Sequence, residues 1–181
     1  GIPAWTTDLP VVAMIDLAEG PSDLITDGNG GSILIASRSY LGVVEVDVVA
    51  QRIGVDGQLI WGENPVNVTD WEAQQEFGRA VPDNNGGAYI VWLDSYSDEY
   101  AYDIWAQHLG SDGNLLWSEH GVQVVGEDGL QGLPIVISDN QNGIIVAWRD
   151  YRFDPDVPDL YVQRVGDILL QNHYFLPIVR K

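Results

Sequence analysis

The sequence predicts an all-β fold made of three tandem 56-residue units, each a four-stranded antiparallel sheet like the blade of a β-propeller. The composition favours strands and turns, with 20 glycines, seven Trp and eight Tyr. Self-similarity at a fixed period is the signature of repeat architectures. Four features recur at a step of 56 residues: the turns that begin at Asp27, Asp83 and Asp139, the residues Asp47, Asp103 and Asp159, the residues Gln51, Gln107 and Gln163, and the residues Trp5, Trp61 and Trp117.

The middle copy shows how one unit is expected to fold. A short first strand, 79–83, precedes a turn rich in Asn and Gly, which tolerate positive φ. The second strand, 87–93, is apolar at successive positions, so we expect it to be buried on both faces. A polar loop leads to the third strand, 103–109. An Asp-Gly hairpin turn at 111–114 then leads to a fourth strand at 115–117.

Strands that are apolar on both faces indicate that the units pack face to face, as propeller blades do. A solenoid of stacked sheets is an alternative, and an immunoglobulin-like sandwich fits a repeat of four strands less well. We place the units at 21–76, 77–132 and 133–181, with an unpaired strand and its loop at 1–20.

The repeat carries recognisable motifs. They are Trp-x-Asp at Trp92 to Asp94 and at Trp148 to Asp150, and Asp-(Ile/Leu)-aromatic-x-Gln at 103–107 and 159–163. With the Asp-x-x-x-Gly-Gly and Asp-Gly-x-(Leu/Ile)-(Leu/Ile)-Trp turns, the pattern resembles the repeat of large secreted bacterial β-propeller-like proteins. The resemblance implies an adhesive or scaffold role. The first unit departs from it, with Ala36-Ser37-Arg38 in place of Trp-x-Asp, and the third lacks the Asp-Gly hairpin.

The charge balance excludes several partners. The chain has 27 acidic and 8 basic residues, a formal charge of −19, which repels nucleic acid and anionic lipid. No apolar run is long enough to span a membrane, so we expect no membrane insertion. Cysteine is absent, which excludes a disulfide framework and thiol chemistry. These features and the resemblance predict an extracellular or cell-surface protein.

Three blades are too few to close a propeller, which needs four to eight. The strand around Trp5 therefore needs a partner, and we expect chains to complete each other's sheets. Reciprocal exchange gives a closed homo-oligomer, and head-to-tail exchange gives a larger ring or a homopolymer, a fibre. The alternative is that the chain is a fragment of a longer propeller. The predicted self-association residues are Trp5, Leu9, Val11, Val12, Phe175, Leu176, Ile178 and Val179.

Calcium is the one cofactor that the sequence supports. Two loops gather carboxylates within about ten residues, and calcium takes six to eight oxygen ligands. The candidate metal ligands are Asp94, Asp98 and Asp103 in one loop, and Asp150, Asp154 and Asp159 in the other. Alternatively, the recurring Asp47, Asp103 and Asp159 bond backbone at the start of a strand. The turn aspartates are better explained by Asx-type hydrogen bonds.

We expect a protein that is not an enzyme. The sequence has no nucleophile elbow or phosphate loop, and we interpret its three histidines, His108, His120 and His173, as incidental. A carboxylate pair for glycoside hydrolysis leaves no motif, and 27 acids give no reason to prefer one pair. The preferred function is structural or adhesive self-assembly. The alternative is a lectin-like, carbohydrate-binding module, with the recurring glutamines either in contacts between blades or beside aromatic residues at a sugar site.

Overall fold

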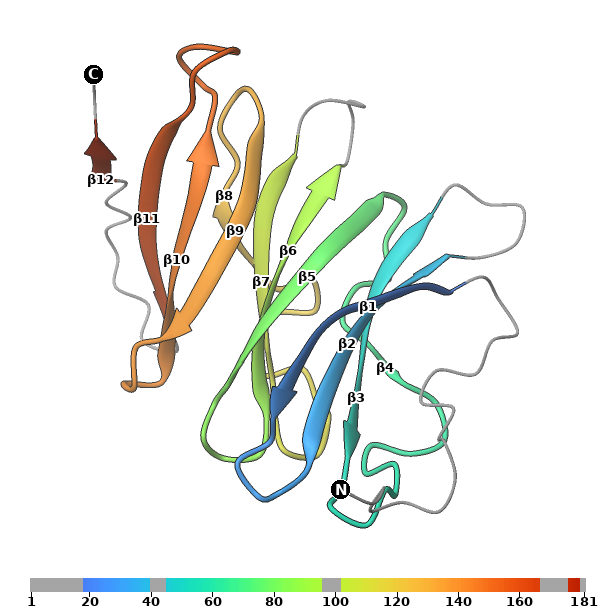
Figure 1. The fold of residues 1–181 in the computed structure, drawn as a ribbon. Helices are drawn as coiled ribbons and strands as arrows, with labels where there is room; N and C mark the ends of the chain where they lie inside the picture. The colour runs from blue at the N-terminus through green and yellow to red at the C-terminus, as the bar shows by residue number, and fades with distance from the viewer. Residues whose placement is uncertain (1–17, 40–44, 96–101, 167–175, 180–181) are drawn as a thin grey trace, which may run out of the picture.

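The computed structural model describes residues 18–39, 45–95, 102–166 and 176–179 (Figure 1). These residues form twelve β-strands and no helix, so the all-β prediction is confirmed. It follows that this part of the chain offers no apolar helix that could cross a membrane.

The strands group into three units of four. Unit 1 contains β1 (Ala18–Thr26), β2 (Ser32–Ser39), β3 (Val46–Ile53) and β4 (Val66–Asn67). Unit 2 contains β5 (Gln74–Pro82), β6 (Ala88–Ser95), β7 (Asp103–Leu109) and β8 (Val122–Val125). Unit 3 contains β9 (Gln131–Ser138), β10 (Gly143–Asp150), β11 (Asp159–Gly166) and β12 (Leu176–Val179). Within each unit, neighbouring strands pair antiparallel in chain order.

The fourth strand of unit 2 lies later in the chain than the sequence predicted. It is Val122–Val125, whereas Leu115 makes only an isolated bridge to Leu109 and Trp117 lies in the connection that follows. The reason is that the buried side chain of Gln107 accepts the backbone N–H of Trp117 at 3.1 Å, where a strand would bond to backbone. The fourth strand predicted at 115–117 is therefore wrong. The predicted strand around Trp5 lies outside the described residues.

Strand β6 explains how the units are held together. Its residues from Ala88 to Leu93 are all buried, as predicted, and they alternate between two hydrophobic cores. Ala88, Ile90 and Trp92 pack toward unit 1, where Ile33 and Ile35 meet them. The opposite side chains pack toward unit 3: Tyr89, Val91 and Leu93 of unit 2 share a core with Ile144, Val146, Trp148 and Tyr161.

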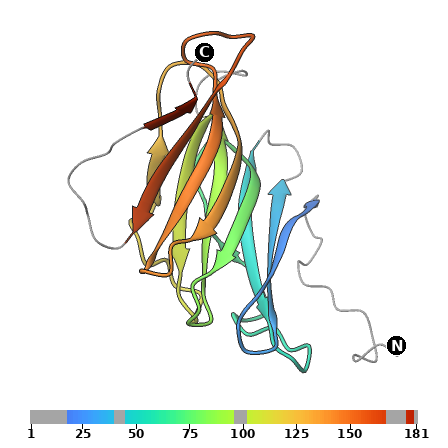
Figure 2. The same cartoon turned by 60° about the vertical axis from the view of Figure 1, so that its left-hand side comes forward.

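The units stand side by side, with unit 2 between the other two (Figures 1 and 2). A single parallel bridge, Val46 to Gln74, joins units 1 and 2 into one sheet. The first strands lie next to each other, since β5 packs against both β1 and β9. No strand pairing among the described residues links unit 3 back to unit 1, so this part of the chain is not a closed ring.

Candidate functional site

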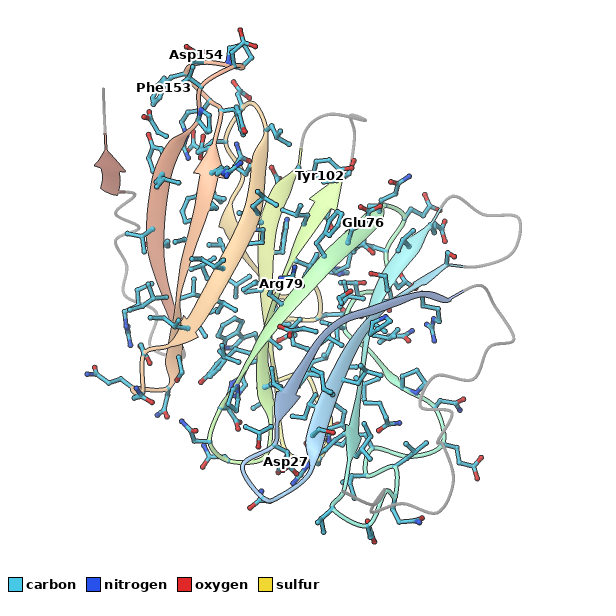
Figure 3. The ribbon with its side chains drawn as sticks, in the orientation of Figure 1. Asp27, Glu76, Arg79, Tyr102, Phe153 and Asp154 are labelled. Atoms are coloured by element: carbon cyan, nitrogen blue, oxygen red, sulfur yellow. The ribbon has the colours of Figure 1, made fainter. Side chains whose placement is uncertain are left out.

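Two hollows flank the first strand of unit 2, β5. The larger, about 270 Å³, lies against β1, and the smaller, about 200 Å³, lies against β9. Phe77 and Arg79 line both hollows, and Figure 3 shows Glu76 and Arg79 on β5. The larger hollow is also lined by Gly20, Pro21, Ser22, Ser37 and Glu76. The smaller is also lined by Leu93, Leu133, Pro134 and Ile135.

A β-bulge presents Phe77 to these hollows. The pairing of β5 with β6 shifts register between Glu76 and Arg79, and Phe77 adopts a φ of 56°. Its side chain is 55% exposed although it lies in a strand. Leu133, one repeat later, has a φ of 51° at the equivalent bulge in β9. A bulky residue at positive φ costs of order 1–3 kcal/mol, and such conformations and bulges cluster at functional sites.

The bulge also needs a glycine. A Cβ on Gly78 would lie 2.7 Å from Cγ2 of Ile35, so only glycine lets β5 approach unit 1 this closely. Arg79 follows, and its Nη1 donates to the backbone oxygen of Ser22 at 2.6 Å. This bond directs the exposed guanidinium across the wall between the two hollows. Arg79 is one of only eight basic residues in a chain of net charge −19, so it is a local positive site.

Two of the predicted metal ligands, Asp94 and Asp103, oppose each other across β6 and β7. Asp94 is 3% exposed, and its Oδ2 accepts the indole N–H of Trp71 at 3.0 Å. Burial, together with the charge of Asp103, raises the pKa of Asp94 to about 6. Burial also raises the pKa of Asp103, whose Oδ2 accepts a hydrogen bond from the side chain of Gln123 at 2.9 Å.

The other units place a cation at this level. In unit 1 Arg38 replaces the first aspartate and lies 3.8 Å from Asp47. In unit 3 Asp150 accepts from Nε of Arg152 at 2.8 Å and from the indole of Trp148 at 2.9 Å. Burial acts to raise the pKa of Asp150, but these hydrogen bonds outweigh it and hold the pKa below its usual value. Unit 2 differs from both, because it opposes two carboxylates.

The remaining predicted metal ligands lie apart from this pair. Asp159 faces Asp150 across β10 and β11, and Asp154 is exposed in the loop above them, where its Oδ1 caps the backbone N–H of Asp156 at 2.9 Å (Figure 3). Asp98 lies outside the described residues. Where side chains are described, no three acidic or histidine residues come together as a metal site. Calcium binding stays a prediction.

The turn aspartates form the Asx hydrogen bonds that the sequence predicted. Oδ1 of Asp83 accepts from the backbone of Asn85 at 2.7 Å and of Gly87 at 2.8 Å. Asp27 and Asp139 make the same two bonds in their units. Oδ2 of each aspartate contacts a cationic or imidazole side chain one repeat apart: Arg52, His108 and Arg164.

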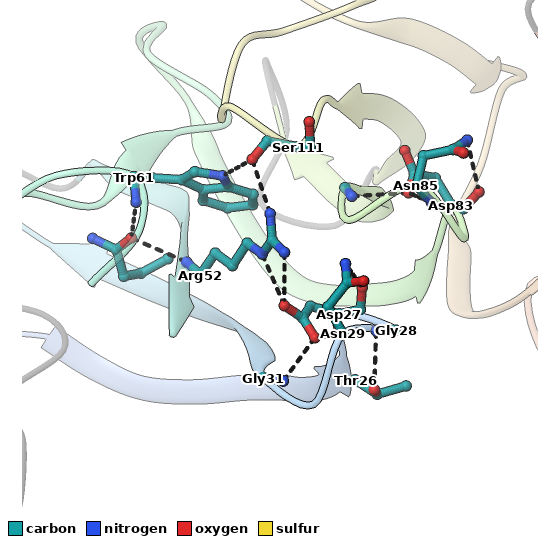
Figure 4. Close-up of polar contacts among 12 residues, drawn as sticks. Thr26, Asp27, Gly28, Asn29, Gly31, Arg52, Trp61, Asp83, Asn85 and Ser111 are labelled. Atoms are coloured by element: carbon teal, nitrogen blue, oxygen red, sulfur yellow. Dashed lines mark hydrogen bonds and ion pairs between the residues drawn. The ribbon is translucent and has the colours of Figure 1, made fainter. Parts of the chain in front are cut away.

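His108 is therefore not incidental, as the sequence had suggested, because it takes the place of an arginine in the repeat. In unit 1, Arg52 does more. Its Nε and Nη2 lie 2.9 and 2.8 Å from Oδ2 of Asp27, and its Nη1 donates to the backbone oxygen of Ser111 at 3.1 Å (Figure 4). Trp61 donates to the same oxygen at 3.0 Å, so these two residues tie unit 1 to the hairpin turn of unit 2.

The recurring glutamines bond within their own units. Oε1 of Gln107 accepts from the backbone of His108 and of Trp117, and its Nε2 donates to Ser118 at 2.8 Å. Gln51 repeats this pattern with the loop after Trp61. The expected contact between blades is wrong for both. Because both side chains are completely buried, they do not face solvent, where a sugar would bind.

Most of the predicted self-association residues cannot be placed. Trp5, Leu9, Val11, Val12 and Phe175 lie outside the described residues. Leu176, Ile178 and Val179 belong to β12, whose backbone pairs with β11 at the edge of the unit 3 sheet. Exchange of strands between chains stays a prediction.

Comparisons with known proteins bear on the fold. No family model matches the sequence, and no curated protein matches it. One solved structure matches the fold, the crystal structure of endo-arabinase from Bacteroides thetaiotaomicron VPI-5482, with a TM-score of 0.54 and 15% sequence identity. The match covers 87% of this chain and 60% of that one, so the chain spans less than two thirds of the matched structure.

This match corrects one expectation. We expected a protein that is not an enzyme, but the structure that shares its fold is that of an enzyme. The expectation rested on missing nucleophile and phosphate motifs. It was unsafe because a pair of carboxylates, which suffices for glycoside hydrolysis, leaves no sequence motif.

Proposed function

We propose that the chain is a carbohydrate-binding protein of the β-propeller type, in which the three units are blades and a polysaccharide lies over the hollows beside β5. The observation that carries the proposal is the exposed ring of Phe77, held by a bulge between two hollows with polar groups beside it. The fold shared with endo-arabinase, a carbohydrate-active enzyme, supports the same ligand class.

The lining suits a sugar. Pyranose and furanose rings present apolar C–H faces and polar edges, so they need an apolar surface with a few directed polar groups. Phe77 and Leu133 supply the apolar surface. Glu76, Ser22 and Arg79 supply an acceptor, a hydroxyl and a donor for sugar hydroxyls in the larger hollow. This corresponds to the lectin-like alternative from the sequence, placed at residues that the sequence did not single out.

An extracellular or cell-surface location belongs to the proposal, because polysaccharides of this kind are found there and the repeat resembles that of secreted proteins. Strand completion between chains through β12 and the N-terminal segment also belongs to it. Neither is needed for binding at β5, and each is tested separately.

The test is binding to a panel of soluble polysaccharides, arabinan among them, by affinity electrophoresis and calorimetry. We expect at least one polysaccharide to bind, and Phe77→Ala to weaken binding about tenfold or more, the loss typical of an anchoring aromatic side chain. Phe153→Ala is the matched control, since Phe153 is equally exposed but lies in the loop between β10 and β11. Assay of the same mixtures for new reducing ends measures hydrolysis.

Two outcomes would overturn the proposal. One is that no polysaccharide binds to a correctly folded protein. The other is that Phe77→Ala and Phe153→Ala bind as the unchanged protein does, because a ligand would then lie away from the hollows.

A further inference from the structure

The outer face of unit 3 is apolar and uncovered. Ile135, Ile137 and Leu160 are 67%, 59% and 47% exposed. One repeat earlier, Ile104 holds the place of Leu160 and is completely buried in the core between units 2 and 3, and Val81 holds the place of Ile137 and packs on that core. Unit 3 thus presents to solvent the face by which unit 2 binds its successor.

Unit 1 presents the complementary face. Units 2 and 3 dock onto the preceding unit through Ala80 and Ile90 or through Val136 and Val146. The equivalent residues in unit 1 are Leu24, which is 62% exposed, and Leu34, which is half-buried. The two ends of the described chain therefore carry the two halves of the junction that it uses twice internally.

Charge favours a junction between these two ends. Leu93 and Ile135 line one hollow at the junction between units 2 and 3. Their equivalents at the free ends are Arg149 on unit 3 and Asp23 on unit 1, so an apolar pair is replaced by residues of opposite charge. Arg149 is exposed, and Asp23 is partly exposed.

We propose that unit 3 binds unit 1 of a second copy of this chain, in the geometry in which unit 2 binds unit 3, with Arg149 beside Asp23 of that copy. The contact joins two different surfaces, so it is heterologous and continues into a ring or a filament. The junction has a smaller core than the internal ones, because Ala36 stands where Trp92 and Trp148 fill the others. It is accordingly weaker and depends on protein concentration.

The test is sedimentation velocity of the complete chain over a wide concentration range at physiological salt. We expect species larger than a dimer that grow with concentration. Leu160→Asp and Leu24→Asp are expected to give monomers, because each places a charge in one half of the junction. Val55→Asp is the control, since Val55 is exposed on a hairpin turn away from both faces.

A charge exchange tests the pairing itself. R149D and D23R are each expected to lower association by about tenfold or more, because each places like charges at the junction. In an equimolar mixture every contact between unlike chains restores an opposite pair, so assembly should recover. Circular dichroism of each variant checks that it is folded.

A monomer at all concentrations overturns the proposal. A dimer that Leu160→Asp dissociates and Leu24→Asp leaves intact also overturns it, because unit 3 would then pair with unit 3. A mixture that stays dissociated overturns the assignment of Arg149 to Asp23.

Discussion

Nε2 of His108 lies 3.1 Å from Oδ2 of Asp83, and this contact takes the place of the ion pair that Arg52 and Asp27 form one unit earlier. Each turn aspartate divides its work between its two oxygens. Oδ1 binds two backbone N–H groups of the turn, and Oδ2 binds a side chain of the third strand. One carboxylate therefore closes the hairpin between the first two strands and ties it to the third.

Replacing Asp83 should cost much more stability than replacing an exposed turn aspartate. Asp83→Ala removes the acceptor for two backbone N–H groups and the partner of His108. We expect it to lower the free energy of unfolding by about 2–4 kcal/mol. Asp112→Ala, in the exposed hairpin turn, removes a bond to Asn114 and should cost less than about 1 kcal/mol. Urea unfolding measures both, and equal losses would contradict the account.

Gly87 is required by close backbone approach rather than by φ. A Cβ at this position would lie 2.1 Å from the backbone oxygen of Leu109, and the equivalent Gly31 and Gly143 show the same conflict with their third strands. We expect Gly87→Ala to destabilise the protein by about 2–4 kcal/mol, as overpacking against backbone does. Gly132→Ala is the control, because nothing lies within 4 Å of its Cβ position, and it should be close to neutral in thermal unfolding.

The buried amide of Gln107 should be hard to replace by an apolar group. Gln107→Leu keeps the volume but leaves the N–H groups of His108 and Trp117 and the oxygen of Ser118 without this partner. Each unsatisfied buried group costs about 1–3 kcal/mol, so a total loss of about 3 kcal/mol or more is expected in chemical denaturation. Gln58→Leu, at an exposed turn position, should change stability by under about 0.5 kcal/mol. A mild effect at Gln107 would show that the loop finds other partners.

The stability contribution of Asp94 should depend on pH between 4 and 6. Its pKa is raised from 3.8 to about 6 on folding, so the folded state holds this proton more tightly than the unfolded state. Ionising the group as the pH rises therefore lowers the free energy of unfolding, by up to about 3 kcal/mol. Asp27 and Asp150 act in the opposite direction, because their pKa values are lowered and the stability they give is lost as the pH falls below 4.

The variant Asp94→Asn isolates this contribution. At pH 4 the native carboxyl is protonated and resembles the amide, so the variant and the unchanged protein should have similar stability. By pH 7 the variant should be the more stable of the two. Urea titrations at each pH measure the difference, and a difference that stays constant from pH 4 to pH 7 would exclude a raised pKa.

The sequence predicted the parts of the fold that local chemistry decides. The turns at Asp27, Asp83 and Asp139 and the two-faced strand β6 follow from residue type and spacing. The position of β8 could not be predicted in this way, because a buried side chain, Gln107, takes the backbone bond that a strand needs. The same side chain explains why the tryptophans recur without marking a strand.

The candidate site escaped the sequence for a related reason. A bulge at Phe77 inverts which face its neighbours occupy, so a period of two read through 74–82 places them wrongly. The step of 56 residues does align Phe77 with Leu133, and both are large apolar residues in otherwise mixed strands. That coincidence was the available signal. Their exposure became visible only with the register.

The position of unit 2 between two cores has a consequence for how the molecule comes apart. Units 1 and 3 each share one core with a neighbour, whereas unit 2 shares both. In a chain of units coupled only to their neighbours, an end unit opens against one interface and the middle unit against two. Backbone amides of β6 and β7 should thus exchange with deuterium last, after those of β2 and β10. Partial opening would release an end unit while leaving the other two folded, so loss of structure would proceed in steps rather than all at once.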